Sequence, residues 1–309
     1  DIPDLRGRVA VVTGGNGGLG LASCSALASA GAHVVMAARK ADKAALAVAE
    51  IEAGDPTGSV EVVPLDLSDL DLVAEAARTI SARHPRIDLL MNNAGLMGPP
   101  FGHTAQGFEM QFGTNHLGHF ALTAHLLPCL LAAAGSRIVH VTSIARFRTD
   151  PLESALTETA ASYRTWYAYG RSKLANHVFA MELHRRLDEA GASTASLSAH
   201  PGLTNSDLQT TSVEMSGGGS SQKFFQRLAH RTGMTVPRGA LSQLRAATDP
   251  SARSGELYAP RFVSVGSPVR RRILDPGLAD RGALLWRISE EATGVELDVA
   301  AAVASARSA

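Results

Sequence analysis

Tyr169 and Lys173 stand four residues apart in a segment whose pattern predicts a helix over residues 162–190. Side chains at this spacing lie on one helix face, so the phenol and the ammonium can reach each other. A free tyrosine ionises near pH ~10, and a neighbouring positive charge favours its phenolate. The pair can therefore exchange a proton with a bound molecule near neutral pH. An ordinary pair on a helix surface is the alternative interpretation.

A glycine-rich turn follows the first apolar run, where residues 13–20 have the sequence TGGNGGLG. Glycine tolerates positive φ and lets backbone amides approach a pyrophosphate closely. The N-terminus of the helix predicted to follow carries partial positive charge for the same anion. Because the turn joins an apolar strand to a helix, we predict dinucleotide binding rather than a ligand-free tight connection. The residues expected to line the dinucleotide are Gly14, Asn16, Gly18, Leu19 and Gly20.

Arg39 and Lys40 end the second predicted strand, about 20 residues beyond this turn, where an acidic residue would favour NAD. The next acid is Asp42. A guanidinium pairs with a 2′-phosphate as a fork, whereas a carboxylate repels it. NADP is therefore predicted, with NAD less favoured. The alternative is that both basic side chains are simply solvated.

Further polar residues stand at or beside the predicted strand ends. Asp66 and Leu67 follow the third strand, where the carboxylate can accept the adenine amino group or cap the next helix. Ser143 ends the fifth strand, where its hydroxyl can donate to a substrate carbonyl or serve a turn. Asn115 lies inside a predicted helix, a poor place for asparagine, which indicates a tertiary role. The fourth strand closes with Asn93, Ala94 and Gly95, where a cofactor can approach.

The elements that must position these residues alternate between short apolar strands and longer helices. Strands are expected at residues 9–12, 33–38, 60–65, 87–91, 137–142 and 193–199. A first helix follows the glycine-rich turn and ends at about residue 30, and further helices are expected at 41–53, 69–83, 107–131, 162–190 and 237–248. This alternation predicts a Rossmann-type, doubly wound parallel sheet with helices on both faces. Ligands of such sheets bind at the carboxyl ends of the strands. No linker divides the chain, so residues 1–309 are interpreted as one domain.

Composition excludes several classes of protein. The chain has 309 residues, 29 basic and 29 acidic side chains, and 45% apolar residues. Zero formal charge argues against a nucleic-acid binder. Only two cysteines, Cys24 and Cys129, are present, which favours a reducing compartment. The longest apolar stretch is too short to span a bilayer. We therefore expect a cytoplasmic protein without a membrane span.

His116 and His119 are three residues apart, a spacing that can serve a metal. Because no third ligand is evident nearby, structural roles are favoured and no metal site is predicted.

Taken together, this ordered set resembles the classical short-chain dehydrogenase/reductase family over about two-thirds of the chain. The longer runs around Asn115 and Tyr169 resemble its retinol-dehydrogenase-like branch, which includes the WW-domain oxidoreductase. The matching residues are Thr13-Gly14, Gly18, Gly20, Asp66, Asn92-Asn93-Ala94-Gly95, Asn115, Ser143, Tyr169, Lys173 and Pro201-Gly202.

The resemblance implies a catalytic role for Asn115, Ser143, Tyr169 and Lys173. Tyr169 would be the acid in carbonyl reduction, and Lys173 would bind the nicotinamide ribose and lower the pKa of Tyr169. Ser143 would polarise the substrate oxygen, and Asn115 would hold a water. The resemblance also implies further cofactor contacts, with the glycines at the pyrophosphate, Asp66 at the adenine, Asn93 at the ribose, Arg39 at the 2′-phosphate, and Pro201, Gly202 and Thr204 beside the nicotinamide.

The substrate is expected to be a lipophilic alcohol or ketone, such as a retinoid, steroid or polyketide. Residues 203–238, where the family builds its substrate lid, contain a Gly/Ser-rich stretch, so a mobile lid and a disordered insertion both stay open. A catalytically inactive NADP sensor and a sugar-nucleotide epimerase or dehydratase are the rival functions. Family resemblance also implies a homodimer or homotetramer, formed through the helices at 107–131 and 162–190.

Overall fold

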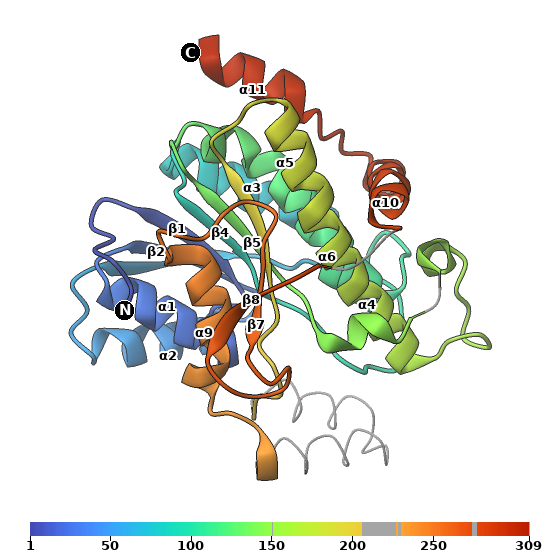
Figure 1. Ribbon diagram of the computed structural model, residues 1–309, viewed down its shortest axis with the longest axis horizontal. Coiled ribbons are helices and arrows are strands. Elements are labelled where there is room, and N and C mark those ends of the chain that lie inside the picture. Colours follow the sequence, from blue (N-terminus) through green and yellow to red (C-terminus); the bar gives the residue numbers. More distant parts are fainter. Residues whose placement is uncertain (150, 206–226, 228–229, 274–276, 309) are drawn as a thin grey trace.

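The computed structural model describes residues 1–149, 151–205, 227, 230–273 and 277–308. Within them the chain forms a single-domain α/β fold around an eight-stranded sheet of order β3-β2-β1-β4-β5-β6-β7-β8 (Figure 1). Strands β1 to β7 are parallel along the sheet and β8 is antiparallel to β7. The strands are β1 Val9–Thr13, β2 His33–Ala38, β3 Ser59–Pro64, β4 Leu89–Asn92, β5 Arg137–Val141, β6 Ala195–Ala199, β7 Leu257–Pro260 and β8 Pro268–Arg271.

Helices cover both faces of the sheet, as the alternation of elements predicts (Figure 1). One face carries α1 Gly18–Ser29, α2 Ala41–Glu52 and α9 Val236–Thr248. The other carries α3 Leu70–Arg83, α4 Met110–Phe112, α5 Gly118–Leu131 and α6 Thr165–Glu189. Two further helices, α10 Leu278–Thr293 and α11 Val299–Ser308, pack outside α5 and α6. Because β1 lies between β2 and β4, the strand order reverses at the end of β1, and this reversal creates the binding position.

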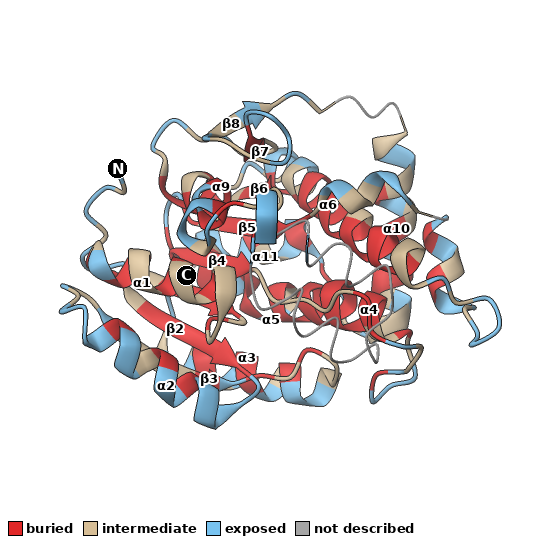
Figure 2. Ribbon diagram, turned by 90° about the horizontal axis from the view of Figure 1, so that it is seen from below, coloured by how far each residue is buried: buried red, intermediate tan, exposed pale blue. Residues whose placement is uncertain are grey.

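The two faces of the sheet bury separate apolar clusters. Val11 and Val35 face α3 and α5, whereas their neighbours Val12, Val34 and Met36 face α1 and α9. Side chains of one strand point alternately to the two faces, so a strand buried on both sides must be apolar throughout. Figure 2 shows the result, with the central strands and α5 largely buried.

Several elements differ from the sequence-based prediction. The helix expected over 107–131 is divided into α4, a π-helix at Gly113–Leu117 and α5, so Asn115 lies in a wide turn. Strands β7 and β8 were not predicted, because each has only four residues and begins or ends in proline. Helix α3 begins one residue later than the predicted 69, because Asp69 is its N-cap and its carboxylate accepts from Asp71 N at 3.0 Å. Helices α10 and α11 lie beyond the last predicted helix, which ended at about residue 248.

Helix α10 is attached to α5 and α6 by an aromatic cluster. The ring of Trp286 lies 5.7 Å from Phe120 and 5.8 Å from Phe179, centroid to centroid. The guanidinium of Arg186 stacks over the Trp286 indole at 3.9 Å. Below them, Ser289 Oγ lies 2.7 Å from His116 Nε2, which is fully buried. These contacts make α10 part of the core that supports α5 and α6.

Trp286→Ala is therefore expected to destabilise the fold by about 3–5 kcal/mol, because it removes a buried aromatic ring and leaves a cavity. The free energy of unfolding, measured by urea denaturation followed by circular dichroism, checks this value. Leu46→Ala is the control, since Leu46 is 73% exposed and should change the stability little. Equal stability of the two variants would contradict the assigned role of α10.

Candidate active site

The glycine-rich turn between β1 and α1 has a backbone that requires glycine at several positions. Gly14 and Gly18 have φ of 65° and 49°, which favours glycine at both positions. A Cβ at Gly20 would lie 2.1 Å from the carbonyl oxygen of Gly14, so only glycine fits there. Helix α1 is capped by Gly17, which offers no side-chain acceptor to its first backbone N–H groups. Those N–H groups are thus directed at the turn, where a pyrophosphate fits.

The ends of β1 and β4 are joined by the hydroxyl of Thr13. Its Oγ1 accepts from the backbone N–H groups of Asn93 and Ala94, both at 3.0 Å. His119 Nδ1 donates to the carbonyl of Asn115, and its Nε2 lies 2.9 Å from Thr13 Oγ1. Burial lowers the pKa of His119 to about 4, so the ring is neutral and Nε2 accepts from the threonine. His119 therefore has a structural role, as expected.

Asn93 acts first as a bridge within the protein. Its Nδ2 donates to the carbonyl of Thr13 at 2.8 Å, and its Oδ1 accepts from Gln243 Nε2 at 3.0 Å. Gln243 lies on α9 and also donates to Ser23 Oγ on α1. Sequence analysis did not single out Gln243. Its one signal was a polar residue on the apolar face of a predicted helix, since Gln243 is 1% exposed.

Arg39 and Asp66 meet beside the glycine-rich turn, at the ends of β2 and β3. Arg39 Nη1 lies 3.7 Å from Asp66 Oδ2, and more than half of the arginine side chain is exposed. The other carboxylate oxygen of Asp66 accepts from the backbone and the hydroxyl of Ser68. The guanidinium is therefore placed, but still accessible, where the adenosine half of a dinucleotide would lie.

The π-helix places the side-chain amide of Asn115 against the turn that follows β4. Its Oδ1 accepts from Leu96 N at 2.6 Å, while Nδ2 donates to Leu96 O and to Ser172 Oγ, both at 2.9 Å. Both amide hydrogens are thus bound to protein atoms. Asn115 links the β4 turn to α6, and a Cβ at Gly95 would approach both Asn115 Oδ1 and Lys173 Nζ within 3.2 Å.

Helix α6 brings Tyr169 and Lys173 to the end of β5. Ser143 lies close enough to Tyr169 to lower the pKa of the phenol, and its Oγ caps the following 3₁₀ turn by accepting from Ala145 N at 3.2 Å. Lys173 Nζ donates to the carbonyl of Val141 at 3.2 Å and lies 5.9 Å from the centre of the Tyr169 ring. The four predicted catalytic residues therefore gather at one edge of the sheet.

Burial dominates the titration of this pair. It raises the pKa of Tyr169 to about 12, and the nearby Ser143 hydroxyl opposes part of that rise. Burial also lowers the pKa of Lys173 to about 8. The expected lowering of the Tyr169 pKa by the ammonium is not seen, because desolvation by burial penalises the phenolate and raises the pKa. The phenol is protonated and can act as an acid.

Pro201, Gly202 and Thr204 follow β6 at the same edge. Gly202 has φ of 76°, and a Cβ there would lie 2.4 Å from the carbonyl oxygen of Ser264. Thr204 Oγ1 donates to the carbonyl of Pro201 at 3.3 Å. Leu19 from the glycine-rich turn packs nearby, 3.0 Å from the position of a Cβ at Gly239. These contacts bring the predicted nicotinamide residues to the end of the sheet that holds Tyr169.

Most of the predicted lid, residues 206–226 and 228–229, lies outside the described residues. The two described ends of this segment are neighbours. Asn205 N donates to Met234 O at 3.0 Å, and Met234 N donates to Leu203 O at 2.8 Å.

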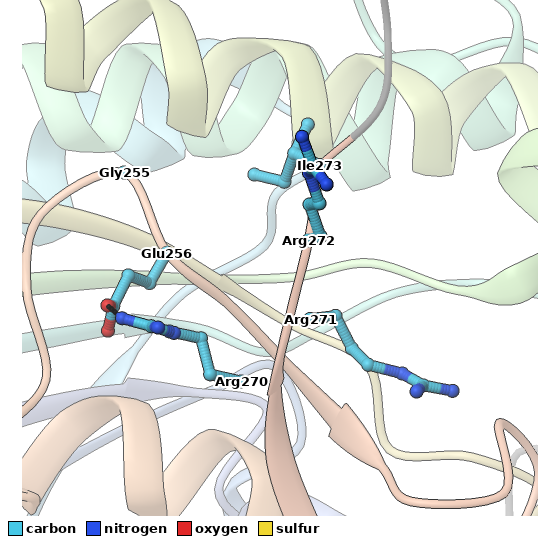
Figure 3. A pocket seen from close by; sticks show the side chains of 6 residues that line it. All are labelled: Gly255, Glu256, Arg270, Arg271, Arg272 and Ile273. Carbon is cyan, nitrogen blue, oxygen red and sulfur yellow. Dashed lines mark hydrogen bonds and ion pairs between the residues drawn. The ribbon is translucent and has the colours of Figure 1, made fainter.

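A cavity of about 460 Å³ lies elsewhere, between the start of β7 and the end of β8 (Figure 3). Glu256 and Arg270 face each other across its edge, with Glu256 Oε1 2.9 Å from Arg270 Nη1, whereas Arg271 points away. Because β7 runs parallel to β6, its start lies at the edge of the sheet opposite Tyr169. The cavity is therefore separate from the candidate active site.

The residues at the carboxyl edge fit a nicotinamide dinucleotide. Glycine at Gly14 and Gly20 lets the turn pack closely against the β4 turn and against itself, which leaves its backbone without covering side chains, and a Cβ at Gly95 would crowd Lys173 Nζ at 3.2 Å. When bound, such a cofactor supplies or accepts a hydride, and the protein orients it.

Comparison with known proteins agrees with this geometry. Residues 8–217 match the family model of the short chain dehydrogenases. Retinol dehydrogenase 11 of Mus musculus is 42% identical over 204 residues, 66% of this chain and 64% of that protein, so the match spans less than two thirds of the relative.

Two solved structures are also similar. A crystal structure of an uncharacterized protein from Mycobacterium Paratuberculosis has a TM-score of 0.77 and 36% identity, and covers 96% of this chain and 97% of its own. A Pseudomonas aeruginosa RhlG/NADP active-site complex has a TM-score of 0.63 and 26% identity, and covers 82% and 94%. Among the described helices, none combines the length and the apolar character that crossing a membrane requires. The chain belongs to the short-chain dehydrogenase/reductase family, in its retinol-dehydrogenase-like branch.

Proposed function

We propose that the protein is an NADP-dependent oxidoreductase that interconverts a carbonyl and an alcohol on a lipophilic small molecule. The observation that carries this proposal is the placement of Tyr169 and Lys173 on one helix, with Lys173 Nζ 5.9 Å from the Tyr169 ring centre and bound to the carbonyl at the end of β5, the strand that the Ser143 hydroxyl follows. A protein that only senses the cofactor does not require this arrangement. We also propose that the predicted cofactor residues bind the dinucleotide, because they lie around the end of β1, where the strand order of the sheet reverses.

In the reducing direction Tyr169 acts as the general acid. Ser143 and Tyr169 both donate hydrogen bonds to the substrate oxygen, which polarises the carbonyl. A bound reduced nicotinamide would supply the hydride to the carbonyl carbon, and Tyr169 would give its proton to the oxygen, so that the alcohol forms. Lys173 would stabilise the phenolate left behind and hold the ribose hydroxyls of the cofactor, and solvent would then restore the Tyr169 proton. The oxidising direction reverses each step.

The preference for NADP rests on Arg39. Its side chain lies at the end of β2 beside Asp66, is more than half exposed and can turn toward a 2′-phosphate. A guanidinium binds such a phosphate through two parallel hydrogen bonds.

The lipophilic character of the substrate is supported by apolar side chains around the site. Ile144 and Phe147 follow Ser143 and are exposed, and Phe262 and Val263 are exposed after β7. The loop after β7 reaches the site, because Leu203 N donates to the carbonyl of Ser264. Exposed apolar residues grouped at one edge are typical of a surface that receives an apolar ligand.

A homodimer or homotetramer is still proposed, but through a different contact surface from the one expected from the sequence. Helices α10 and α11 of the same chain cover the outer side of α5 and α6, where sequence analysis placed the contact between subunits. We therefore propose that any homodimer or homotetramer uses another surface. The two free, buried cysteines, Cys24 and Cys129, fit the proposed cytoplasmic location, where thiols stay reduced.

Tyr169→Phe is expected to lower kcat by about 10²- to 10⁴-fold, because it removes the proton donor but leaves the ring. NADPH oxidation with a panel of lipophilic ketones and aldehydes measures this loss, and NADPH fluorescence shows that the cofactor still binds. Tyr167→Phe is the matched control on the same helix and should stay active. Equal turnover by the wild type and Tyr169→Phe would remove Tyr169 as the acid, and NADPH binding without any turnover would favour the sensor.

Arg39→Asp is expected to shift the ratio of kcat/KM for NADPH over NADH by at least about tenfold toward NADH, since a charged hydrogen bond contributes about 1.5–3 kcal/mol. Paired kinetics with the two cofactors measure the ratio. Lys40→Asp is the control for charge alone, because it changes the neighbouring exposed residue. An unchanged ratio in Arg39→Asp would exclude Arg39 from the phosphate site.

Carbonyl reduction is expected to slow as the pH rises through about 8, where the buried Lys173 ammonium loses its proton. Tyr169, with a pKa of about 12, stays protonated across this range and does not cause the loss. The dependence of kcat/KM on pH measures the inflection. Lys173→Arg, which stays charged, should remove that inflection even if its overall activity is lower. A profile that stays flat up to pH ~10 would contradict the assignment.

A further inference from the structure

Three side chains from distant parts of the sequence meet at the β3 edge of the sheet, away from the candidate active site. His33 begins β2, Glu61 lies within β3, and His84 directly follows α3. Strands β2 and β3 are parallel, and His33 pairs with Ser59. Glu61 is two residues further along β3 than Ser59, so its side chain lies on the same face of the sheet as His33. The C-terminus of α3 brings His84 over both strands.

The two imidazoles and the carboxylate converge on one point. Glu61 Oε1 lies 2.6 Å from His84 Nε2 and 3.7 Å from His33 Nε2. The ligand atoms of the three side chains all lie within 4.8 Å of one another. A tetrahedral ion with bonds of about 2.0–2.1 Å holds its ligands roughly 3.3 Å apart. Shifts of about an ångström, within the freedom of half-buried side chains, would therefore complete such a site.

The surrounding hydrogen bonds favour the orientation that a metal needs. His33 Nδ1 lies 2.7 Å from Ser59 Oγ, which leaves Nε2 directed at Glu61. Metal-binding histidines in general engage their second ring nitrogen in this way, because the contact fixes the tautomer and the ring plane. The three side chains are between 15% and 33% exposed, so a water can reach a fourth position.

We propose that His33, Glu61 and His84 form a binding site for a divalent transition-metal ion, with zinc as the best match. Two imidazoles and one carboxylate are a donor set that zinc accepts, with water as the fourth ligand. The site lies on the edge strand and ties it to α3, and it is remote from Tyr169. Its role is structural: the ion links β2, β3 and the end of α3, the part of the dinucleotide-binding half farthest from the centre of the sheet.

Arg83 occupies part of this cluster and competes with the ion. Its Nη1 lies 3.2 Å from Glu61 Oε2, on the carboxylate oxygen that does not face the histidines. About half of the Arg83 side chain is exposed, so it can turn into solvent when a cation binds. Arg83 is therefore not a ligand, and removing its charge should strengthen the site.

Isothermal titration calorimetry with zinc chloride tests the proposal on the full, untagged chain after dialysis against a chelator. We expect one zinc ion per wild-type chain. Glu61→Gln and His84→Gln should each weaken zinc binding by about 100-fold or more. Residues that only hydrogen-bond a metal ligand typically contribute about 10–100-fold. Ser59→Ala should weaken zinc binding by about tenfold. Zinc should also raise the Tm of the wild type and leave the Tm of Glu61→Gln unchanged.

Two control variants separate a metal site from an ordinary cluster of ion pairs. His103→Gln removes an exposed histidine outside the cluster and should bind zinc like the wild type. Arg83→Gln should bind zinc more tightly, a gain that a misfolded variant cannot produce. No zinc binding by the wild type, or equal binding by the wild type, Glu61→Gln and His84→Gln, would overturn the proposal.

Discussion

The arrangement of the catalytic residues depends on the side-chain amide of Asn115. Its hydrogen bonds to Leu96 and Ser172 hold the β4 turn, which borders the cofactor position, against α6, which carries Tyr169 and Lys173. An α-helical turn at residues 113–117 would place this amide differently, so the π-helix is needed for the link. Asn115 thus links the part of the site proposed to hold the dinucleotide to the part proposed to transfer the proton.

The strands, most helices and the edge of the sheet that carries the site could be predicted from sequence. Apolar runs buried on both faces, such as Val9–Thr13, and glycines followed by a helix leave clear local patterns. The π-helix could not be predicted, because its cause is a tertiary hydrogen bond rather than a local preference. Thr13 and Gln243 were missed as positioning residues for the same reason: each connects elements far apart in the sequence.

The burial that positions Tyr169 and Lys173 also opposes their ionisation. Both pKa shifts come first from desolvation, and both favour the neutral form. A buried phenol and a buried amine gain their charged states only when new charges or hydrogen bonds surround them. Burial therefore keeps the Tyr169 phenol protonated, and the balance between phenol and phenolate depends on the charges and hydrogen bonds that surround it.

The meeting of Asn205 and Met234 at the base of the segment between them has a consequence for how this fold diversifies. Because the two ends are already held together, the chain between them can change in length and composition without moving β6, α9 or the proton donor. If this segment forms the substrate lid, as the family resemblance implies, the choice of substrate is separated from the proposed proton transfer. An exchange of this segment between relatives would then transfer preference for a substrate while leaving Tyr169 and Lys173 in place.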